Sequence, residues 1–331
     1  MNILALYICE EVYRKKKGGN IVEYNISDTD KQISARLKAI GHNVAIAEYS
    51  RQFLKSSAKN YDIIFNLCDG LEGDNTFQEI KILRDIEETG IPFTGNNANA
   101  VKKCNDKGLT KRILITKGLR TPRFQIFRTG KEKLKDLNFP LFVKPLKSDA
   151  AYGIKADSFV RTEKKAYKKI KEIIKVYKLP ALVEEYIDGR EFSVPVVGCS
   201  KSLGLPPIEI RYGGYYTNKP KILSYTAKWN FKSRLWYNVE TIVPKDITGK
   251  LKKKLCSTAW KSFKALKCSG YGTVDMKVDV QGRIFVLEVN PNCYIGPNCD
   301  SAKAAKEMGM DYGQFLQKIV ELGMERKIKP S

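Results

Sequence analysis

Histidine is almost absent from this chain: His42 is the only one among 331 residues. Ser–His and Cys–His nucleophilic catalysis and His-ligated zinc sites therefore have very little material here. The eight cysteines include no Cys-x-x-Cys pair. We expect free thiols in the reducing cytoplasm, because disulfide frameworks belong mainly to small secreted domains. If the protein is an enzyme, its chemistry must use carboxylates, lysines, arginines, backbone amides and a metal.

Long apolar runs are also lacking. The opening stretch, MNILALYICEEVYRKKK, has too short an apolar run to span a membrane, and charges follow it at once. We expect a first strand there and no association with a membrane.

Acidic residues are few relative to basic ones, since 59 lysines and arginines against 36 aspartates and glutamates give a net charge of +23. Such an excess favours anionic partners. Much of it is lysine on predicted helices such as 163–178, where a solvated helix face is the simpler interpretation. No compact cluster of arginines and aromatics accompanies the charge, so nucleic acid is not an expected partner. An acidic or carrier-bound substrate and a compositional bias toward lysine both stay open.

Strands and helices alternate over the first hundred residues, which predicts a parallel sheet with helices on its faces. Further along, a long helix at 245–267 precedes a hairpin at 272–290 that turns at Gly282. The length suggests two or three domains. We divide the chain into an N-terminal domain, a central domain and a C-terminal domain at 1–100, 101–180 and 181–331.

The hairpin carries polar residues on one face of a sheet that should be buried. Period-two alternation puts Thr273, Asp275 and Lys277 on one face of its first strand. Glu288 and Asn290 alternate in the same way on the second strand, and the tight turn brings them opposite Asp275. Two carboxylates and an amide oxygen are ligands that suit Mg²⁺ or Mn²⁺. A satisfied polar patch is the alternative, but burying paired carboxylates without a cation is costly.

Lysines and a small-residue loop indicate a phosphate site. Lys144 ends an apolar strand, where it needs an anionic partner. The loop 147–155 contains Ser148 and Gly153 and can cover phosphates with its backbone amides. Lys107, in the sequence NDKGLTK, is a further candidate, with an ordinary surface lysine as the alternative.

The stretch ALVEEYIDGREF, from Ala181, runs from apolar to acidic residues at the end of a predicted strand. Such a segment fits a hinge that holds adenine and ribose, and an exposed acidic turn is the alternative. The candidate nucleotide-binding residues in it are Glu184, Glu185, Tyr186, Ile187 and Glu191.

Taken in order, these pieces resemble the ATP-grasp superfamily and, within it, the D-alanine–D-alanine ligase group. The pieces are NDK, FVKP, the small-residue loop, LVEEYIDGREF, Asp275-Met276 and LEVNPN, and the segments 62–107 and YTAKW are similar as well. The similarity runs nearly end to end, and the combination is specific although each piece alone is not. It implies an α/β fold that is α+β in its ATP-grasp part, with an N-terminal Rossmann-like parallel sheet followed by two ATP-grasp subdomains.

The resemblance also implies a role for each position. Lys107 and Lys144 would hold the ATP phosphates, and Lys228 in YTAKW would reach the γ-phosphate from a flexible loop. The adenine and ribose would lie at Glu184, at the backbone of 185–187 and at Glu191. The implied metal ligands are Asp275, Glu288 and Asn290. The implied reaction joins a carboxylate to an amine through an acyl phosphate, with amino acids or small peptides as substrates and a homodimer as the assembly.

The chain departs from that group at the position of a catalytic arginine. Thr273 stands where the group has an arginine that steadies the oxyanion, and a hydroxyl cannot replace a guanidinium. Lys277 or Arg211 could substitute for it. Otherwise the chemistry is lost or altered.

Further departures lie on the side of the amino-acid substrates. Ala150 and Ala151 replace two serines, Trp229 replaces a tyrosine, and only Glu23 stands as a candidate amine-binding carboxylate in a rewritten N-terminal segment. We therefore expect a ligase with another carboxylate and another amine. The aromatic and arginine-rich region 206–238 could line a pocket for a larger acceptor or could be ordinary packing. A ligase for a larger peptide or protein, and a nucleotide-binding protein without ligase activity, are the alternatives.

Overall fold

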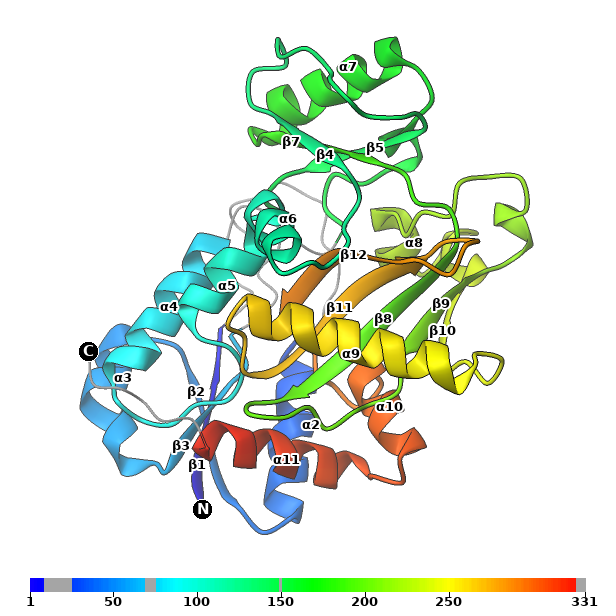
Figure 1. Ribbon diagram of the computed structural model, residues 1–331. Coiled ribbons are helices and arrows are strands. Elements are labelled where there is room, and N and C mark those ends of the chain that lie inside the picture. The colour runs from blue at the N-terminus through cyan, green and yellow to red at the C-terminus, as the bar shows by residue number, and fades with distance from the viewer. Residues whose placement is uncertain (9–25, 69–75, 149–150, 326–331) are drawn as a thin grey trace.

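The computed structural model of the protein describes residues 1–8, 26–68, 76–148 and 151–325. Its strands form three separate sheets. The three-stranded sheet lies at the lower left of Figure 1, the five-stranded sheet at the centre and the four-stranded sheet at the top. No helix within these described ranges is long and apolar enough to cross a membrane.

The first sheet is parallel, as predicted, with the strand order β2-β1-β3. Its strands are β1 (Asn2–Tyr7), β2 (Asn43–Glu48) and β3 (Ile63–Asn66). The helices that follow these strands are α2 (Ile26–Ala39), α3 (Arg51–Ser57) and α4 (Thr76–Glu88). Alternation along β1 separates the two faces, because Ile3 shares a buried cluster with α2 whereas Leu4 shares one with α3 and α4.

The end of the chain returns to this first sheet. α10 (Asp300–Glu307) and α11 (Tyr312–Met324) follow the last strand, and α11 packs against β3 and α2. Phe315 and Ile319 of α11 lie in the same buried cluster as Ile3. A segment that we assigned to the third domain therefore contributes to the core around the first sheet, and the division into three domains stays a prediction.

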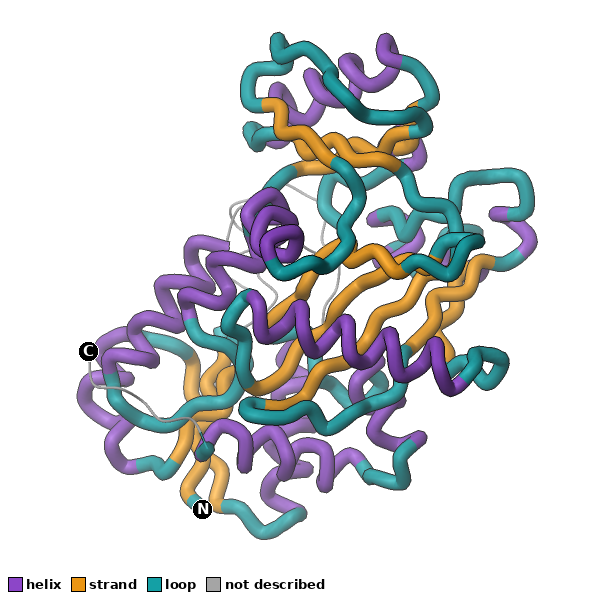
Figure 2. The backbone as a smooth tube through the Cα atoms, in the orientation of Figure 1, coloured by secondary structure: helices purple, strands orange, loops and turns teal. Residues whose placement is uncertain are grey.

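The four-stranded sheet is antiparallel, with the order β4-β7-β5-β6. Its strands are β4 (Phe124–Phe127), β5 (Leu141–Pro145), β6 (Phe159–Val160) and β7 (Ala181–Glu185). α7 (Glu163–Glu172) covers one face and continues into a π-helical turn at Ile173–Tyr177 (Figure 2). α5 (Ala98–Asn105) and α6 (Lys107–Thr116) lead from the first sheet to this one. Since β7 pairs with β4 and β5, the sheet extends past residue 180, where we had placed a boundary.

The five-stranded sheet has the order β10-β9-β8-β11-β12. Its strands are β8 (Arg190–Gly198), β9 (Ile208–Tyr212), β10 (Val239–Ile242), β11 (Gly270–Val278) and β12 (Ile284–Pro291). α9 (Gly249–Ala265) crosses one face, where its Phe263 joins Val274 and Met276 in a buried cluster (Figure 1). Thr273 and Asp275 alternate with these residues and so lie on the opposite face.

Short helical segments complete the described chain. α8 (Tyr225–Trp229) lies between β9 and β10 in the sequence. The 3₁₀ turns are Ala58–Asn60, Ala156–Ser158, Gly214–Tyr216 and Trp236–Asn238.

Candidate active site

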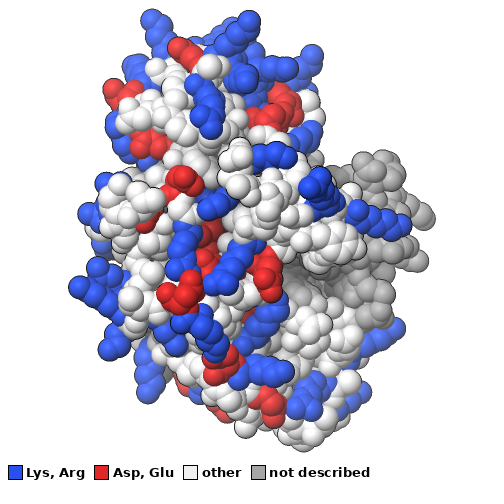
Figure 3. Space-filling view, turned by 90° about the vertical axis from the view of Figure 1, so that its right-hand side faces the viewer, with Lys and Arg blue, Asp and Glu red and all other residues white. Residues whose placement is uncertain are grey.

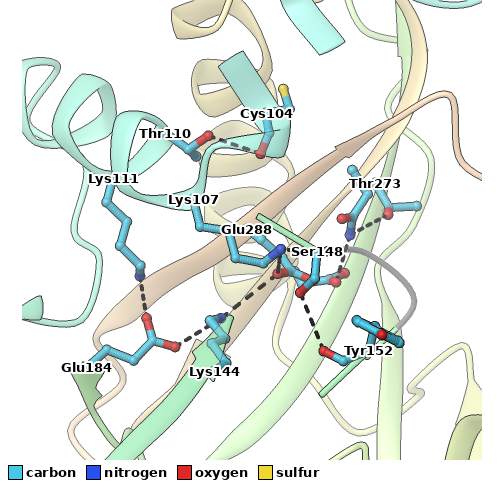
Figure 4. Close-up of polar contacts among 12 residues, drawn as sticks. Cys104, Lys107, Thr110, Lys111, Lys144, Ser148, Tyr152, Glu184, Thr273 and Glu288 are labelled. Atoms are coloured by element: carbon cyan, nitrogen blue, oxygen red, sulfur yellow. Dashed lines mark hydrogen bonds and ion pairs between the residues drawn. The ribbon is translucent and has the colours of Figure 1, made fainter. Parts of the chain in front are cut away.

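Two lysines from different elements converge on one carboxylate (Figure 4). Lys107 begins α6 and Lys144 lies on β5, and their Nζ atoms are 3.6 Å and 3.9 Å from Oε2 of Glu288 on β12. Both lysine side chains are buried, whereas the side chain of Glu288 is 28% exposed. Asp106 caps α6 by accepting from the N–H of Leu109 at 2.9 Å, which fixes the turn that carries Lys107. Two cations therefore meet beside a carboxylate that is open to solvent.

A third buried lysine, Lys111, was missed from the sequence. Its Nζ lies 2.7 Å from Oε2 of Glu184 and donates to Oγ1 of Thr121 at 2.7 Å. Lys144 Nζ lies 3.0 Å from Oε1 of the same glutamate. Burial would raise the pKa of Glu184, but the two ammonium groups lower it to about 2. The spacing could have identified Lys111, because Lys107 and Lys111 are four residues apart on one helix and so share a face.

The structure does not support the predicted contact between the Glu184 side chain and adenine. Both oxygens of Glu184 are engaged by lysines, and the side chain is only 4% exposed. The Oε1 atom of Glu185 accepts from the backbone N–H of Asn138 at 2.9 Å. The N–H groups of Glu185 and Tyr186 donate to carbonyls of neighbouring segments, and Ile187 is half-buried. A role for residues 185–187 in holding adenine stays a prediction.

The structure brings Asp275, Glu288 and Asn290 together on one face. Asp275 lies directly opposite Glu288 in the β11–β12 ladder, and Nδ2 of Asn290 donates to Oδ2 of Asp275 at 2.8 Å. A β-bulge at Leu287 separates Glu288 from Val286, which joins the buried cluster under α9. The extra residue lets Val286 and Glu288 face opposite sides of the sheet although they are two residues apart.

The charges around these two carboxylates differ. Burial raises the pKa of Asp275 to about 7, and the charge of Glu288 adds to the rise. Burial also acts to raise the pKa of Glu288. Three lysines outweigh that effect and lower the pKa, namely Lys107, Lys144 and Lys228.

This donor set fits a divalent cation. The raised pKa means that Asp275 keeps a proton up to near neutral pH, because Glu288 faces it. A divalent cation would take the place of this proton between the two carboxylates. Within the part of the chain that the structure describes, no three or more His, Cys, Asp or Glu residues gather as a metal site. Two carboxylates and an amide suit Mg²⁺ in particular, because that ion takes few protein ligands and keeps water and phosphate oxygens. Asp275, Glu288 and Asn290 as its ligands remain a prediction.

The described residues of the small-residue loop contact Lys107 of the same site. The ammonium of Lys107 donates to the carbonyl of Ser148, and the hydroxyl of Ser148 donates to the carbonyl of Tyr152 at 3.4 Å (Figure 4). Gly153 has a φ of +77°, and an added Cβ there would lie 2.7 Å from Cγ of Pro145. Glycine is therefore required for the loop to return against β5.

Lys228 approaches the candidate metal residues from α8. The N–H of Tyr225, the first residue of α8, donates to the carbonyl of Ile154 at 3.1 Å, which ties this helix to the loop. The charge of Lys228 acts to lower the pKa of both Asp275 and Glu288. The predicted γ-phosphate lysine is therefore close enough to affect the metal residues electrostatically.

A second cluster lies beside the hinge. Lys277 Nζ is 3.3 Å from Oε2 of Glu191 on β8, and the hydroxyl of Tyr212 donates to the same oxygen at 2.8 Å. Lys277 Nζ also lies 4.9 Å from the ring centroid of Tyr186. Burial acts to lower the pKa of Lys277, but Glu191 and Tyr186 outweigh it and raise the pKa. The predicted ribose residue is thus held by two neighbours.

Comparison with known proteins identifies the family. Residues 113–321 match the protein family described as D-ala D-ala ligase C-terminus. A D-alanine–D-alanine ligase of Carboxydothermus hydrogenoformans is 30% identical over 319 residues, which cover 93% of this chain and 96% of that protein. The chain belongs to the D-alanine–D-alanine ligase family.

The chain is also similar to other proteins along most of its length. An uncharacterized protein of Sinorhizobium fredii, y4sG, is 28% identical, with 89% of this chain and 87% of that protein covered. The crystal structure of D-alanine–D-alanine ligase from Bacillus anthracis matches with a TM-score of 0.75 and 25% identity, covering 98% of this chain and 97% of that one. Members of the family are ATP-dependent ligases that form peptide C–N bonds. The predicted family and fold class are confirmed.

One departure from the D-alanine–D-alanine ligase pattern now has a place in the structure. Thr273 is 8% exposed, and its Oγ1 lies 3.5 Å from Nδ2 of Asn290. Lys277 lies on the same face, four residues further along β11, and pairs there with Glu191. Its ammonium group is committed to Glu191, which argues against Lys277 as the substitute for the missing arginine.

Arg211, the other proposed substitute, lies on the wrong face. Glu191 is opposite Ile210 in the β8–β9 ladder, so Arg211 points to the face away from Glu191. There Arg211 forms ion pairs with Glu209 at 3.1 Å and with Asp246 at 3.0 Å. We therefore withdraw Arg211 as a candidate catalytic residue.

The remaining departures are only partly visible. Ala151 has a φ of 61°, whereas Ala150 and Glu23 lie outside the described residues. Trp229 ends α8, with Nζ of Lys228 at 5.1 Å from its ring.

Aromatic rings in the region 206–238 pack on one another. Tyr212 and Tyr216 have ring centroids 4.9 Å apart, and those of Phe231 and Trp236 are 4.6 Å apart. Phe231 and Trp236 are also partly exposed, at 50% and 37%. Packing therefore accounts for the Tyr212–Tyr216 pair. An acceptor pocket that includes Phe231 and Trp236 stays a prediction.

Proposed function

We propose that the protein is an ADP-forming ligase that uses ATP and Mg²⁺, or Mn²⁺ in its place, to join the carboxylate of one amino acid or small peptide to the amine of another. The observation that carries the proposal is the convergence of Lys107 and Lys144 on Glu288, beside Asp275 and Asn290. The two lysines could bind the negative phosphates of a triphosphate, and the carboxylates and the amide could bind the divalent metal that accompanies it.

Each residue has a proposed part in this arrangement. Lys107 and Lys144 would bind phosphoryl oxygens, together with backbone amides of the loop around Gly153. Lys228 would bind the γ-phosphate from α8. The residues that would hold the cation are Asp275, Glu288 and Asn290. When bound, the cation would offset phosphate charge during the reaction.

The reaction proceeds in two balanced steps. An oxygen of the substrate carboxylate attacks the γ-phosphorus of ATP, the bond to the bridging oxygen breaks, and ADP leaves. The amine nitrogen then attacks the carbon of the acyl phosphate, phosphate leaves, the nitrogen loses a proton and the amide forms. The lysines contribute by positioning the phosphates and neutralising their charge.

The substrates are proposed to differ from two D-alanines. Thr273, Ala151 and Trp229 stand at positions where the family pattern is different, whereas the nucleotide and metal positions keep that pattern. A larger peptide or a protein as a substrate is the alternative. A homodimer and a cytoplasmic location complete the proposal, on the family resemblance and the cysteine pattern of the sequence.

The test is ADP release with ATP and Mg²⁺ against pools of D- and L-amino acids and short peptides, read by mass spectrometry. We expect a product that is lighter than its two substrates together by one water. Glu240→Gln, which changes an exposed glutamate on β10, is the matched control for a Glu288→Gln variant. ATP turnover that needs neither a carboxylate nor an amine would contradict the proposal.

A second candidate function is nucleotide binding without ligation, and one observation favours it. Neither Arg211 nor Lys277, among the described residues, stands in for an arginine at Thr273. This function predicts Mg²⁺-dependent binding of ATP with no condensed product from any pool. Product formation by a Thr273→Arg variant alone would favour this second candidate, and product formation by the wild-type protein would exclude it.

A further inference from the structure

A segment without acidic residues leads from β9 to β10. Residues 210–239 contain six lysines and arginines and eight aromatic residues, but no aspartate or glutamate. The segment includes α8, which lies above β8 and β9 in Figure 1. Arg211 stands apart from the other cations, because it pairs with Glu209 and Asp246. The rest of the segment therefore offers positive charge and aromatic surface without negative charge of its own.

Two cations of this segment lie over one aromatic ring. Nζ of Lys219 is 3.4 Å from the ring centroid of Tyr215, and the guanidinium carbon of Arg234 is 5.5 Å from the same centroid. Both cationic side chains are exposed, and neither has a carboxylate partner in the ranges that the structure describes. A contact with a ring face holds a cation in place without neutralising its charge. Lys219 and Arg234 are therefore two positioned positive charges that can attract an anion.

Hydrogen bonds fix the backbone around these two cations. Oδ1 of Asn238 accepts from the N–H of Tyr215 at 3.0 Å, and Nδ2 of Asn238 donates to the carbonyl of Arg234 at 2.9 Å. The hydroxyl of Ser233 donates to the carbonyl of Thr226 in α8 at 3.2 Å. One asparagine thus joins the turn that carries the ring to the loop that carries the guanidinium, and Ser233 joins that loop to α8.

The same helix connects the two cations to the candidate active site. The charge of Lys228 on α8 acts to lower the pKa of both Asp275 and Glu288, so α8 lies close to the candidate metal residues. Lys219 precedes α8 in the chain and Arg234 follows it. A substrate with its reacting group at the candidate metal residues can therefore extend along α8 to these two cations.

Resting on the proposed ligase function, we infer that Lys219 and Arg234 bind a substrate carboxylate that takes no part in the reaction. The favoured substrate is then an acidic amino acid or a peptide with an acidic side chain. A carboxylate accepts two parallel hydrogen bonds from a guanidinium and pairs with an ammonium group. A neutral amide of the same shape would leave both cations without an anionic partner.

Nucleic acid matches this surface less well than an acidic substrate. Single-stranded nucleic acid binds by stacking its bases on aromatic side chains. Here two cations already lie over the ring of Tyr215, and Phe231 and Trp236 contact each other edge to face with centroids 4.6 Å apart. The position beside the candidate active site also favours a substrate of the ligase.

The test measures the preference of the protein for acidic substrates over their amides. The protein receives ATP, Mg²⁺, a pool of partner amino acids and an equimolar pair of probes, which is glutamate with glutamine or Ala-Glu with Ala-Gln, each in D and L forms. Mass spectrometry quantifies each condensed product. We expect kcat/KM to be at least about tenfold higher for the acidic member of the pair that reacts, since it gains a charge-assisted hydrogen bond.

Replacement of either cation should reduce this preference. In Arg234→Gln, and separately in Lys219→Gln, we expect the preference to fall below about threefold through a higher KM for the acidic substrate, with kcat unchanged. Arg128→Gln is the matched control, because Arg128 is an exposed arginine after β4 and has no carboxylate partner among the residues described. It should keep the wild-type preference. Thermal unfolding shows whether each variant is folded.

The outcomes separate the inference from the proposed function. Products formed with equal kcat/KM from acidic and amide substrates would overturn the inference and leave the ligase function standing. So would a preference that survives in both Arg234→Gln and Lys219→Gln. Binding of single-stranded RNA that Arg234→Gln weakens, without any preference for the acidic substrates, would assign the surface to nucleic acid instead. No ADP release with any pool would overturn the proposed function, and the inference with it.

Discussion

Three exposed lysines of α7 and the buried lysines of the candidate active site have opposite surroundings. On α7, Lys164, Lys165 and Lys168 are exposed and have no carboxylate partner within the described residues, unlike the buried Lys169 of the same helix. Lys107 and Lys144 are buried and each lies within 4 Å of Glu288. Figure 3 shows lysine and arginine side chains spread over one face of the molecule, including its upper lobe. The net charge of +23 therefore describes the surface and says little about the site.

Burial decides where the charge of a lysine has chemical consequences. An exposed lysine interacts weakly with its surroundings, because water and salt screen it. A buried lysine requires a partner, and the partners here are Glu184 and Glu288. The carboxylates keep the lysines charged and in place, so that a phosphate finds preformed cations.

Loss of the carboxylate at the centre of the buried group should have the largest effect. We predict that Glu288→Gln reduces Mg²⁺-dependent turnover by about a hundredfold or more, since it removes a metal ligand and the partner of two lysines. Steady-state kinetics at several Mg²⁺ concentrations measure this, and circular dichroism should show an intact fold. Glu240→Gln should retain wild-type activity. An active Glu288→Gln enzyme would refute the metal assignment.

Removal of a buried lysine that contacts no phosphate in the proposal should mainly affect stability. We predict that Lys111→Met lowers the free energy of unfolding by about 3 kcal/mol, because Glu184 then keeps only one of its two ion pairs. Chemical denaturation measures the loss. The double variant Lys111→Met/Glu184→Gln should recover part of it, since the buried carboxylate is then gone and Lys144 keeps Glu288 as a partner.

The exposed Lys168→Met is the matched control for that experiment. It should change the unfolding free energy by less than about 0.5 kcal/mol. Equal losses of unfolding free energy in Lys111→Met and Lys168→Met would contradict the prediction that burial and ion pairing make the Lys111 side chain more important for stability.

The metal-free protein should lose stability as the pH rises toward neutrality. The pKa of Asp275 is raised from 3.8 to about 7, by burial first and by Glu288 second, with Ser193 and Lys228 opposing the rise. The Asp275 carboxyl binds its proton more tightly in the folded protein than in the unfolded chain. This binding stabilises the fold fully below the ordinary pKa of 3.8, and the stabilisation is lost as the pH rises through about 7. Thermal unfolding in EDTA between pH 4.5 and 7.5 measures the decline, and Mg²⁺ should reduce it. A midpoint that is equally pH-dependent with and without Mg²⁺ would contradict the assignment.

Neutralising the exposed lysines should have the smallest effect. The triple variant Lys164→Gln/Lys165→Gln/Lys168→Gln should keep kcat and the KM for ATP within about twofold of wild type. Steady-state kinetics at low and at physiological salt measure this. A large rise in KM only at low salt would show that surface charge steers the nucleotide to the site.

Residues whose position depends on a strict local period were predictable from the sequence. Asp275, Glu288 and Asn290 were placed on one face because strands alternate with period two and a tight turn joins them. The bulge at Leu287 was not foreseen, and it is what brings Glu288 opposite Asp275, because unbroken pairing from the turn would place Leu287 there. Lys144 was identified as buried because it ends an apolar strand.

Residues whose partners come from distant elements were harder to predict. Lys111, on helix α6, was missed because its carboxylate partner, Glu184, lies 73 residues further along the chain on strand β7. Arg211 was misplaced because its face depends on the register of β9 against β8, which no local pattern fixes. The predicted boundary at 180 cut β7 from its sheet, since strand pairing is a property of the fold and not of the segment.

The most direct test of the account is a crystal structure of the protein with Mg²⁺ and a non-hydrolysable ATP analogue. The account predicts a cation at about 2.1 Å from oxygens of Asp275, Glu288 and Asn290. Phosphate oxygens should lie within hydrogen-bond distance of Lys107 and Lys144. A nucleotide bound away from these lysines, or a cation held by other residues, would contradict it.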